Sequence, residues 1–72
     1  MEDRLKLSAR NILKGTIKKV TKGQTTAHVV IEVGGQPIMA SITNEAVEEL
    51  GLRDGMQAFA VIKASDVMIA AE

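Results

Sequence analysis

Two short runs of the sequence combine hydroxyl, cationic and small side chains. Ser8-Ala9-Arg10-Asn11 contains a hydroxyl, a guanidinium and an amide, and Lys63-Ala64-Ser65 contains an ammonium and a second hydroxyl. Hydroxyls, backbone amides and one or two cations suit a tetrahedral dianion, because they donate to its oxygens and offset the desolvation of its charge. The alanines let an anion approach the backbone, and Asp66 beside the second run must turn outward. The runs indicate an oxyanion site, although such combinations also occur on ordinary solvated surfaces.

Other kinds of chemistry have little support in the sequence. The chain has no cysteine, and its one histidine, His28, has no evident triad partner and is expected to be exposed or at an interface. A single histidine cannot form a zinc site, so no metal held directly by protein ligands is expected. The acids between Glu45 and Glu49 are expected to be solvated surface charge. We therefore expect a binding protein and not an enzyme.

Nucleic acid and membranes are not expected as partners. Single-strand sites use aromatic side chains for base stacking, and the one aromatic residue, Phe59, lies among apolar neighbours that predict a place in the core. Because the formal net charge is zero, counterion release would contribute little to such binding. No apolar run approaches the roughly 20 residues that cross a bilayer, and the N-terminal residues lack the apolar stretch of a secretory signal.

Length and the lack of cysteine favour an oligomer. A domain of 72 residues buries only about 60% of its unfolded surface and is marginal alone, and the lack of cysteine removes stabilisation by disulfides. The absence of cysteine also fits a cytoplasmic protein. Seven Lys/Arg and two acids lie between Met1 and Lys22, against two Lys/Arg and seven acids in the remainder. Two interpretations stay open: an N-terminal segment that faces an anion, or two oppositely charged segments that pair.

Alternation of apolar residues predicts short strands joined by turns. Gly34-Gly35 predicts a two-residue hairpin of the primed type, because both positions need positive φ. Pro37 predicts that the returning strand lies at an edge, and Gly15 indicates a bulge or a sharp bend in the first strand. The five expected strands are 11–20, 25–33, 36–42, 56–63 and 66–69, and the second has an apolar face of Ala27, Val29, Ile31 and Val33.

One short helix is expected over residues 45–50. Thr43 or Asn44 can cap its N-terminus, and Gly51 can end it. Its apolar stripe consists of Ala46, Val47 and Leu50. Five short strands and one helical turn predict a mainly β protein that forms a small barrel. Residues 1–72 are expected to form one domain, with a core from about residue 5 to about residue 70.

Three segments resemble one known family. KLSARNILKG (6–15) and AVIKASDVMIA (60–70) are similar to the opening and closing segments of the molbindin family, the molybdenum-pterin-binding or Mop domains of the TOBE type. The middle of the chain, ITNEAVEELGLRDGM (42–56), looks like the family pattern ITxxSVxxLGLxxGM. The same domain serves as an accessory oxyanion-binding module in molybdate-responsive regulators and in molybdate transporter ATPases. The resemblance covers nearly the whole chain.

The resemblance implies a fold and a site. The implied fold is a five-stranded barrel of oligonucleotide-binding topology. The resemblance also implies the assembly of single-domain members, a homohexamer built as a trimer of dimers that holds molybdate or tungstate at subunit interfaces. Asn11 belongs to the motif with an expected structural role, and Ala46 stands where many members have a serine, which would remove one hydrogen bond if that hydroxyl contacts the anion. The residues implied for the oxyanion site are Ser8, Ala9, Arg10, Thr43, Lys63, Ala64 and Ser65.

The resemblance also implies a function. The expected protein is a cytoplasmic homo-oligomer that stores molybdate, and tungstate as well, without catalysing a reaction. The alternative is a molybdate-sensing regulatory module that acts on a protein partner. A third hypothesis is a barrel that binds single-stranded nucleic acid. It is disfavoured because the chain has a single aromatic residue on which bases could stack.

Overall fold

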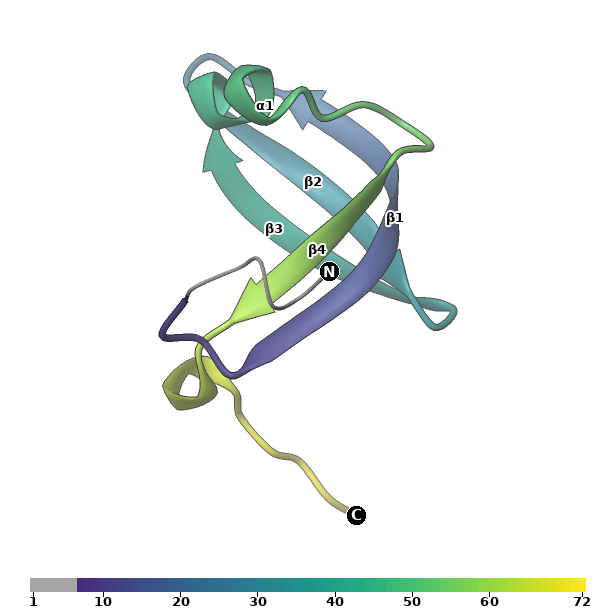
Figure 1. Ribbon diagram of the computed structural model, residues 1–72, viewed down its shortest axis with the longest axis vertical. Helices are drawn as coiled ribbons and strands as arrows, with labels where there is room; N and C mark the ends of the chain where they lie inside the picture. The colour runs from purple at the N-terminus through teal and green to yellow at the C-terminus, as the bar shows by residue number, and fades with distance from the viewer. Residues whose placement is uncertain (1–6) are drawn as a thin grey trace.

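The computed structural model describes residues 7–72, which form a mainly β fold with one α-helix (Figure 1). The expected start of the core at residue 5, and Lys6 of the first family-like run, lie outside the described residues. In chain order the elements are β1 (Asn11–Lys22), β2 (Thr26–Val33), β3 (Gln36–Thr43), α1 (Asn44–Leu50), β4 (Gln57–Ile62) and the 3-10 turn η2 (Ala64–Asp66).

All the strands pair antiparallel in one sheet of order β3-β2-β1-β4. The long strand β1 changes partner at Thr16, which pairs with Gln57 of β4 on one side and with Glu32 of β2 on the other. The sheet is curled, so that β4 crosses in front of β2 and β3 in Figure 1. Within the described residues β3 and β4 are therefore the two edges of an open sheet.

The core lies on the concave face of this sheet. Ala27, Val29 and Ile31 of β2 are buried there, which confirms the alternation expected for this strand. Ile17 of β1 and Val47 of α1 complete the buried cluster. The partly buried residues packed against it include Val20, Val33, Ile38, Ala40, Ile42, Leu52, Met56, Ala58 and Ala60.

The hairpin between β2 and β3 has the predicted geometry. Gly34 and Gly35 have φ of 56° and 82°, as a primed turn requires, and Val33 pairs with Gln36 directly across it. Pro37 lies in β3, which pairs only with β2 in the described sheet. Its predicted position on an edge strand is confirmed.

Of the two alternatives expected at Gly15, a bulge or a sharp bend, the bulge is wrong. The register of β1 against β2 shifts between Ile17 and Lys19, so the bulge lies at Lys18. At Gly15 two strands approach closely instead: a Cβ atom there would collide with the Glu32 carbonyl oxygen and lie 2.8 Å from Val33 Cγ2. The strand also continues to Lys22, beyond its expected end at Val20.

The expected fifth strand at 66–69 is absent, so the sheet is open and not a closed five-stranded barrel. Asp66 N–H donates to the Lys63 carbonyl oxygen at 2.9 Å, which turns the chain directly after β4. A strand needs a neighbouring edge, and the segment that follows lies along none of the strands described here (Figure 1). The side chains of Val67, Met68 and Ile69 are 45%, 92% and 88% exposed.

The helix α1 begins as expected but packs less completely than its sequence indicates. Of the two candidate caps Thr43 is the right one, since its Oγ1 accepts a hydrogen bond from Ala46 N–H at 3.0 Å. At the other end Gly51 N–H donates to the Glu48 carbonyl oxygen. Val47 is buried, whereas Leu50 of the predicted apolar stripe is 64% exposed.

The core position expected for Phe59 is also wrong. Phe59 pairs with Lys14, and it alternates with Ala58 and Ala60, which are the residues of β4 that pack against the core. The ring is therefore half-buried outside the core cluster. In the described part of the chain, no helix has the length and apolar character required to span a membrane.

Candidate functional site

The pairing of β1 with β4 brings the two candidate runs to one end of the sheet. The pairing ends with Asn11 opposite Ile62; residues 8–10 immediately precede this pair, and residues 63–65 immediately follow it. The side-chain amide of Asn11 donates to the Ile62 carbonyl oxygen at 3.2 Å, in agreement with the structural role expected for it. Six of the seven site residues implied by the sequence thus lie on two adjacent segments.

The first segment presents its polar groups to solvent. Ala9 is buried, whereas Ser8 and Arg10 on either side of it are exposed. The guanidinium of Arg10 donates to the Ser8 carbonyl oxygen at 3.3 Å. Burial of Ala9 therefore fixes the backbone while the hydroxyl and the guanidinium remain accessible to a ligand.

The second segment supplies backbone donors as well as side chains. The first hydrogen bond of η2 runs from Asp66 N–H to the Lys63 carbonyl oxygen, so the N–H groups of Ala64 and Ser65 have no acceptor within the turn. Lys63, Ala64 and Ser65 are all exposed. Asp66 is exposed too, and its backbone N–H, unlike those of Ala64 and Ser65, donates a hydrogen bond within the turn.

Thr43 lies at the opposite end of the sheet. It pairs with Thr26 at the beginning of β2, next to Ala27, which pairs with Lys22 at the far end of β1. Its side-chain oxygen caps α1 through Ala46, the position where the family pattern has serine. Within one chain the structure therefore does not bring Thr43 to the other six residues.

Two ion pairs in the part of the chain that the structure describes join its basic and acidic halves. Lys18 Nζ lies 3.6 Å from Glu32 Oε1, and Lys22 pairs with Glu48. The hydrogen bond and the charge of Lys22 lower the pKa of the exposed Glu48 carboxyl below its ordinary value. Pairing therefore accounts for part of the charge asymmetry. These two pairs do not involve Arg10 or Lys63, the cations of the two candidate runs, so the interpretation that the runs face an anion remains open.

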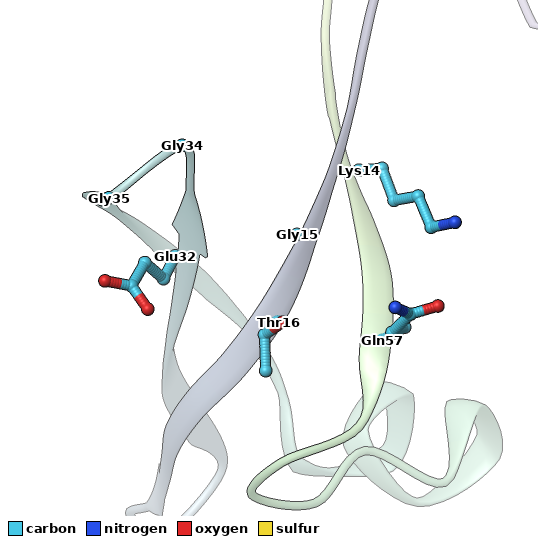
Figure 2. Close-up of a pocket in the computed structure, with 7 residues that line it drawn as sticks. All are labelled: Lys14, Gly15, Thr16, Glu32, Gly34, Gly35 and Gln57. Carbon is cyan, nitrogen blue, oxygen red and sulfur yellow. The ribbon is translucent and has the colours of Figure 1, made fainter.

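A polar hollow that sequence reasoning did not predict lies beside the β2–β3 hairpin. It has a volume of about 330 Å³. In Figure 2 the side chains of Lys14 and Gln57 lie on one side of β1 and Glu32 on the other, so they do not converge on one point. The sequence signal that could have indicated this hollow is its three glycines, Gly15, Gly34 and Gly35, because they have no side chains to fill it. The lining residues are Lys14, Gly15, Thr16, Glu32, Gly34, Gly35 and Gln57.

The hollow is a weaker oxyanion site than the paired runs. Its one ammonium, on Lys14, is accompanied by the Glu32 carboxylate, which repels an anion and already pairs with Lys18. Direct metal binding has no support either: between residues 7 and 72 no group of three or more His, Cys, Asp or Glu side chains could hold an ion. The paired runs therefore remain the candidate site.

Comparisons with known proteins identify relatives over nearly the whole chain. The family model described as "TOBE domain" matches residues 7–69. Molybdenum-pterin-binding protein 1 of Clostridium pasteurianum is 48% identical over 68 residues, which are 93% of this chain and 100% of the relative. A solved molybdate binding protein from Sporomusa ovata is 33% identical with a TM-score of 0.88, covering 93% of this chain and 100% of that chain.

A further solved structure extends these likenesses. The cytoplasmic molybdate-binding protein ModG, solved with molybdate bound, is 48% identical with a TM-score of 0.86, over 94% of this chain and 49% of that chain. The matched residues 7–69 include both candidate runs, from Ser8 to Ser65. The chain belongs to the TOBE-domain family, and its relatives within it include the molybdenum-pterin-binding (Mop) proteins.

Proposed function

We propose that this protein is a cytoplasmic storage protein that binds molybdate, and tungstate as well, at the interfaces between its subunits and catalyses no reaction. The observation that carries the proposal is the Asn11–Ile62 pair, which places the two donor-rich runs on adjacent segments at one end of the sheet. Relatives named as molybdenum-pterin-binding and molybdate-binding proteins support the choice of anion.

Each residue of the site has a proposed role that follows from its chemistry. Ser8 and Ser65 donate hydroxyl hydrogen bonds, and Arg10 and Lys63 supply positive charge. The backbone amides around Ala9 and Ala64 complete the donors around the four oxygens. Discrimination against sulfate rests on the size of the site, and discrimination against phosphate rests on the lack of an acceptor for its proton.

The positions of these residues favour a site between chains. Exposed donors on one side of an anion leave the other side to be completed by a second chain, and Thr43 can take part only from a neighbouring subunit because it lies at the far end of its own sheet. We propose a homohexamer, a trimer of dimers, with no nucleic-acid or membrane partner.

Binding to the assembled form links storage to stability. An anion that binds only the oligomer adds RT ln(1 + [L]/Kd) to its apparent stability, which helps a chain of 72 residues whose sheet is open. We therefore expect the midpoint of thermal unfolding to rise with molybdate concentration and to stay unchanged with sulfate.

The deciding experiment is isothermal titration with molybdate and with tungstate, with sulfate as the control, on protein whose mass is followed by light scattering. Tight binding of both oxyanions by an oligomer, with little response to sulfate, is the expected result. A protein that is indifferent to molybdate would contradict the proposed function. Binding by a monomer would contradict the interface location alone.

A further inference from the structure

The outer face of the sheet, opposite the core, carries the one histidine of the chain between two hydroxyl groups. His28 of β2 lies between Ala27 and Val29, which are buried, so its side chain is on the outer face, where it is exposed. Thr21 of β1 pairs with His28 on one side, and Ser41 of β3 pairs with it on the other. Directly opposite residues share a face, with Cβ atoms about 4.5–5.5 Å apart. Both hydroxyl residues are exposed, so the imidazole has neutral polar neighbours.

The same face leads from His28 to Thr43. Thr26 lies two residues before His28 in β2 and pairs with Thr43, the last residue of β3. His28 and Thr43 are therefore diagonal neighbours across the β2–β3 pair, roughly 7–8 Å apart, a separation that aromatic and long side chains can span. Thr43 Oγ1 accepts a hydrogen bond from Ala46 N–H, and a hydroxyl that accepts in this way keeps its proton for donation to a ligand.

The charged residue next to His28 on the outer face is a lysine. Lys19 pairs with Val30, which follows His28 by two positions in β2, and its side chain is exposed. Strand β3 has no charged residue. Two of the acids nearby are already paired, one with Lys18 and one with Lys22. The other charged residues of β1, β2 and α1 are Lys14, Lys18 and Lys22, Glu32, and Glu45, Glu48 and Glu49.

We propose that protonation of His28 regulates the affinity of the interface site for its oxyanion. The imidazolium adds a positive charge beside Thr43, and its flanking hydroxyls carry no charge that would offset it. This role rests on the proposed function, because Thr43 meets the anion only between subunits. Histidine is the side chain whose charge ordinarily changes near neutral pH. Binding therefore tightens on mild acidification, and the stored anion is released as the pH rises.

Protonation and anion binding are reciprocally coupled. If the protonated form binds the anion more tightly by some factor, the bound anion favours protonation by the same factor. We expect molybdate to bind about three- to tenfold more tightly at about pH 6 than at about pH 8.5, as suits a solvent-screened charge near a dianion. Carboxylates ordinarily titrate near about pH 4 and lysine ammonium groups above about pH 10, so this interval isolates the histidine.

The single histidine makes the coupling directly measurable. The ring proton signals of His28 in an untagged chain are followed by NMR as the pH is varied, without anion, with molybdate, and with sulfate at equal ionic strength. Molybdate is expected to raise the midpoint of this titration by about 0.5–1 pH unit, the same three- to tenfold factor, and sulfate to leave it unchanged. A midpoint that saturating molybdate does not move would overturn the proposal.

Substitutions separate the charge of His28 from its structural place. Isothermal titration with molybdate at both pH values is carried out on the parent, His28→Gln and His28→Lys, whose side chains stay exposed at this position. His28→Gln should bind at both pH values as weakly as the parent does at the higher one, and His28→Lys should bind tightly at both. Glu45→Gln, which removes the acid two residues after Thr43, is the matched control and should keep the parental pH dependence.

The outcomes distinguish this role from the proposed function. If the parent binds molybdate with the same affinity at both pH values, or if His28→Gln keeps the parental pH dependence, the role of His28 is overturned while molybdate storage stands. If the parent binds no molybdate at either pH, both proposals fail. Far-UV circular dichroism establishes that each variant retains the β fold of the parent chain.

Discussion

The side-chain amide of Asn11, the first residue of β1, donates a hydrogen bond of 3.2 Å to the carbonyl oxygen of Ile62, the last residue of β4. The two residues are separated by 51 positions in the sequence. This bond lies at the point where the chain enters the sheet from one candidate run and leaves it for the other. It therefore holds together the two segments from which the proposed oxyanion site is built.

Loss of this bond should weaken both the fold and the site. We expect Asn11→Ala to lower the free energy of unfolding by about 1 kcal/mol, because the part-buried Ile62 carbonyl loses its donor, and to weaken molybdate binding as well. Urea denaturation and isothermal titration measure the two effects. Asn44→Ala is the matched control, since it removes the 3.0 Å hydrogen bond that the Asn44 side-chain amide donates to the Gly23 carbonyl oxygen at the other end of β1. Equal losses of affinity in both variants would argue against a positioning role for Asn11.

The guanidinium of Arg10 should contribute directly to binding. Arg10→Ala is expected to weaken molybdate binding by roughly 1–3 kcal/mol, because charged hydrogen bonds to the anion are lost. Titration calorimetry with Arg53→Ala as the control measures the difference, since Arg53 is exposed in the turn that follows α1. An affinity in Arg10→Ala equal to that of the parent protein would remove Arg10 from the site.

Thr43 should have two separable roles. Its Oγ1 caps α1 by accepting from Ala46 N–H at 3.0 Å, so Thr43→Ala is expected to lower the free energy of unfolding by about 1 kcal/mol. If a neighbouring subunit also uses its hydroxyl, molybdate affinity falls in Thr43→Ala and is retained in Thr43→Ser. Thermal unfolding and calorimetry of the two variants distinguish the roles. Unchanged affinity in both would leave Thr43 as a helix cap only.

Close approach at Gly15 predicts that no side chain is tolerated there. Gly15→Ala should destabilise the fold by about 1–3 kcal/mol, because the new methyl group would lie 2.8 Å from Val33 Cγ2 and against backbone that cannot yield easily. Gly34→Asn is the control: its Cβ meets nothing within 4 Å, and asparagine followed by glycine suits a primed turn. Denaturation midpoints of the two variants provide the comparison, and similar midpoints would contradict the prediction.

The Lys22–Glu48 pair predicts a pH dependence. The pKa of Glu48 is lowered in the folded chain by the hydrogen bond and then by the charge of Lys22. A lowered pKa stabilises the fold above the ordinary glutamate value of about 4.3, and this contribution is lost as the pH falls through the folded value. Glu48→Gln should therefore reduce the loss of stability on acidification below about pH 4.

The effect is expected to be small, because the pair is exposed to solvent and screened by salt. Thermal unfolding between about pH 3 and pH 7 at low ionic strength measures it. Glu49→Gln leaves the Lys22–Glu48 pair in place and should keep the parental pH dependence. If Glu48→Gln and the parent protein lose stability equally on acidification, the pair contributes nothing to the fold.

Local patterns in the sequence determined the features that depend on neighbouring residues. The period of two in β2 identified Ala27, Val29 and Ile31 as buried, because alternation places them on one face. Gly34-Gly35 predicted its turn from the positive φ that only glycine adopts freely, and Thr43 was among the residues able to cap α1. The family was also recognisable, because its motifs are contiguous runs of the chain.

Pairing between distant segments was decided by the tertiary structure alone. The bulge at Lys18 and the close approach at Gly15 depend on the register of β1 against β2, which no local pattern contains. The segment after Asp66 has the composition of a strand, yet it pairs with no strand of the described sheet, and Val67, Met68 and Ile69 stay exposed. Both donor runs can be read from the sequence, but only the antiparallel pairing of β1 with β4 makes them neighbours.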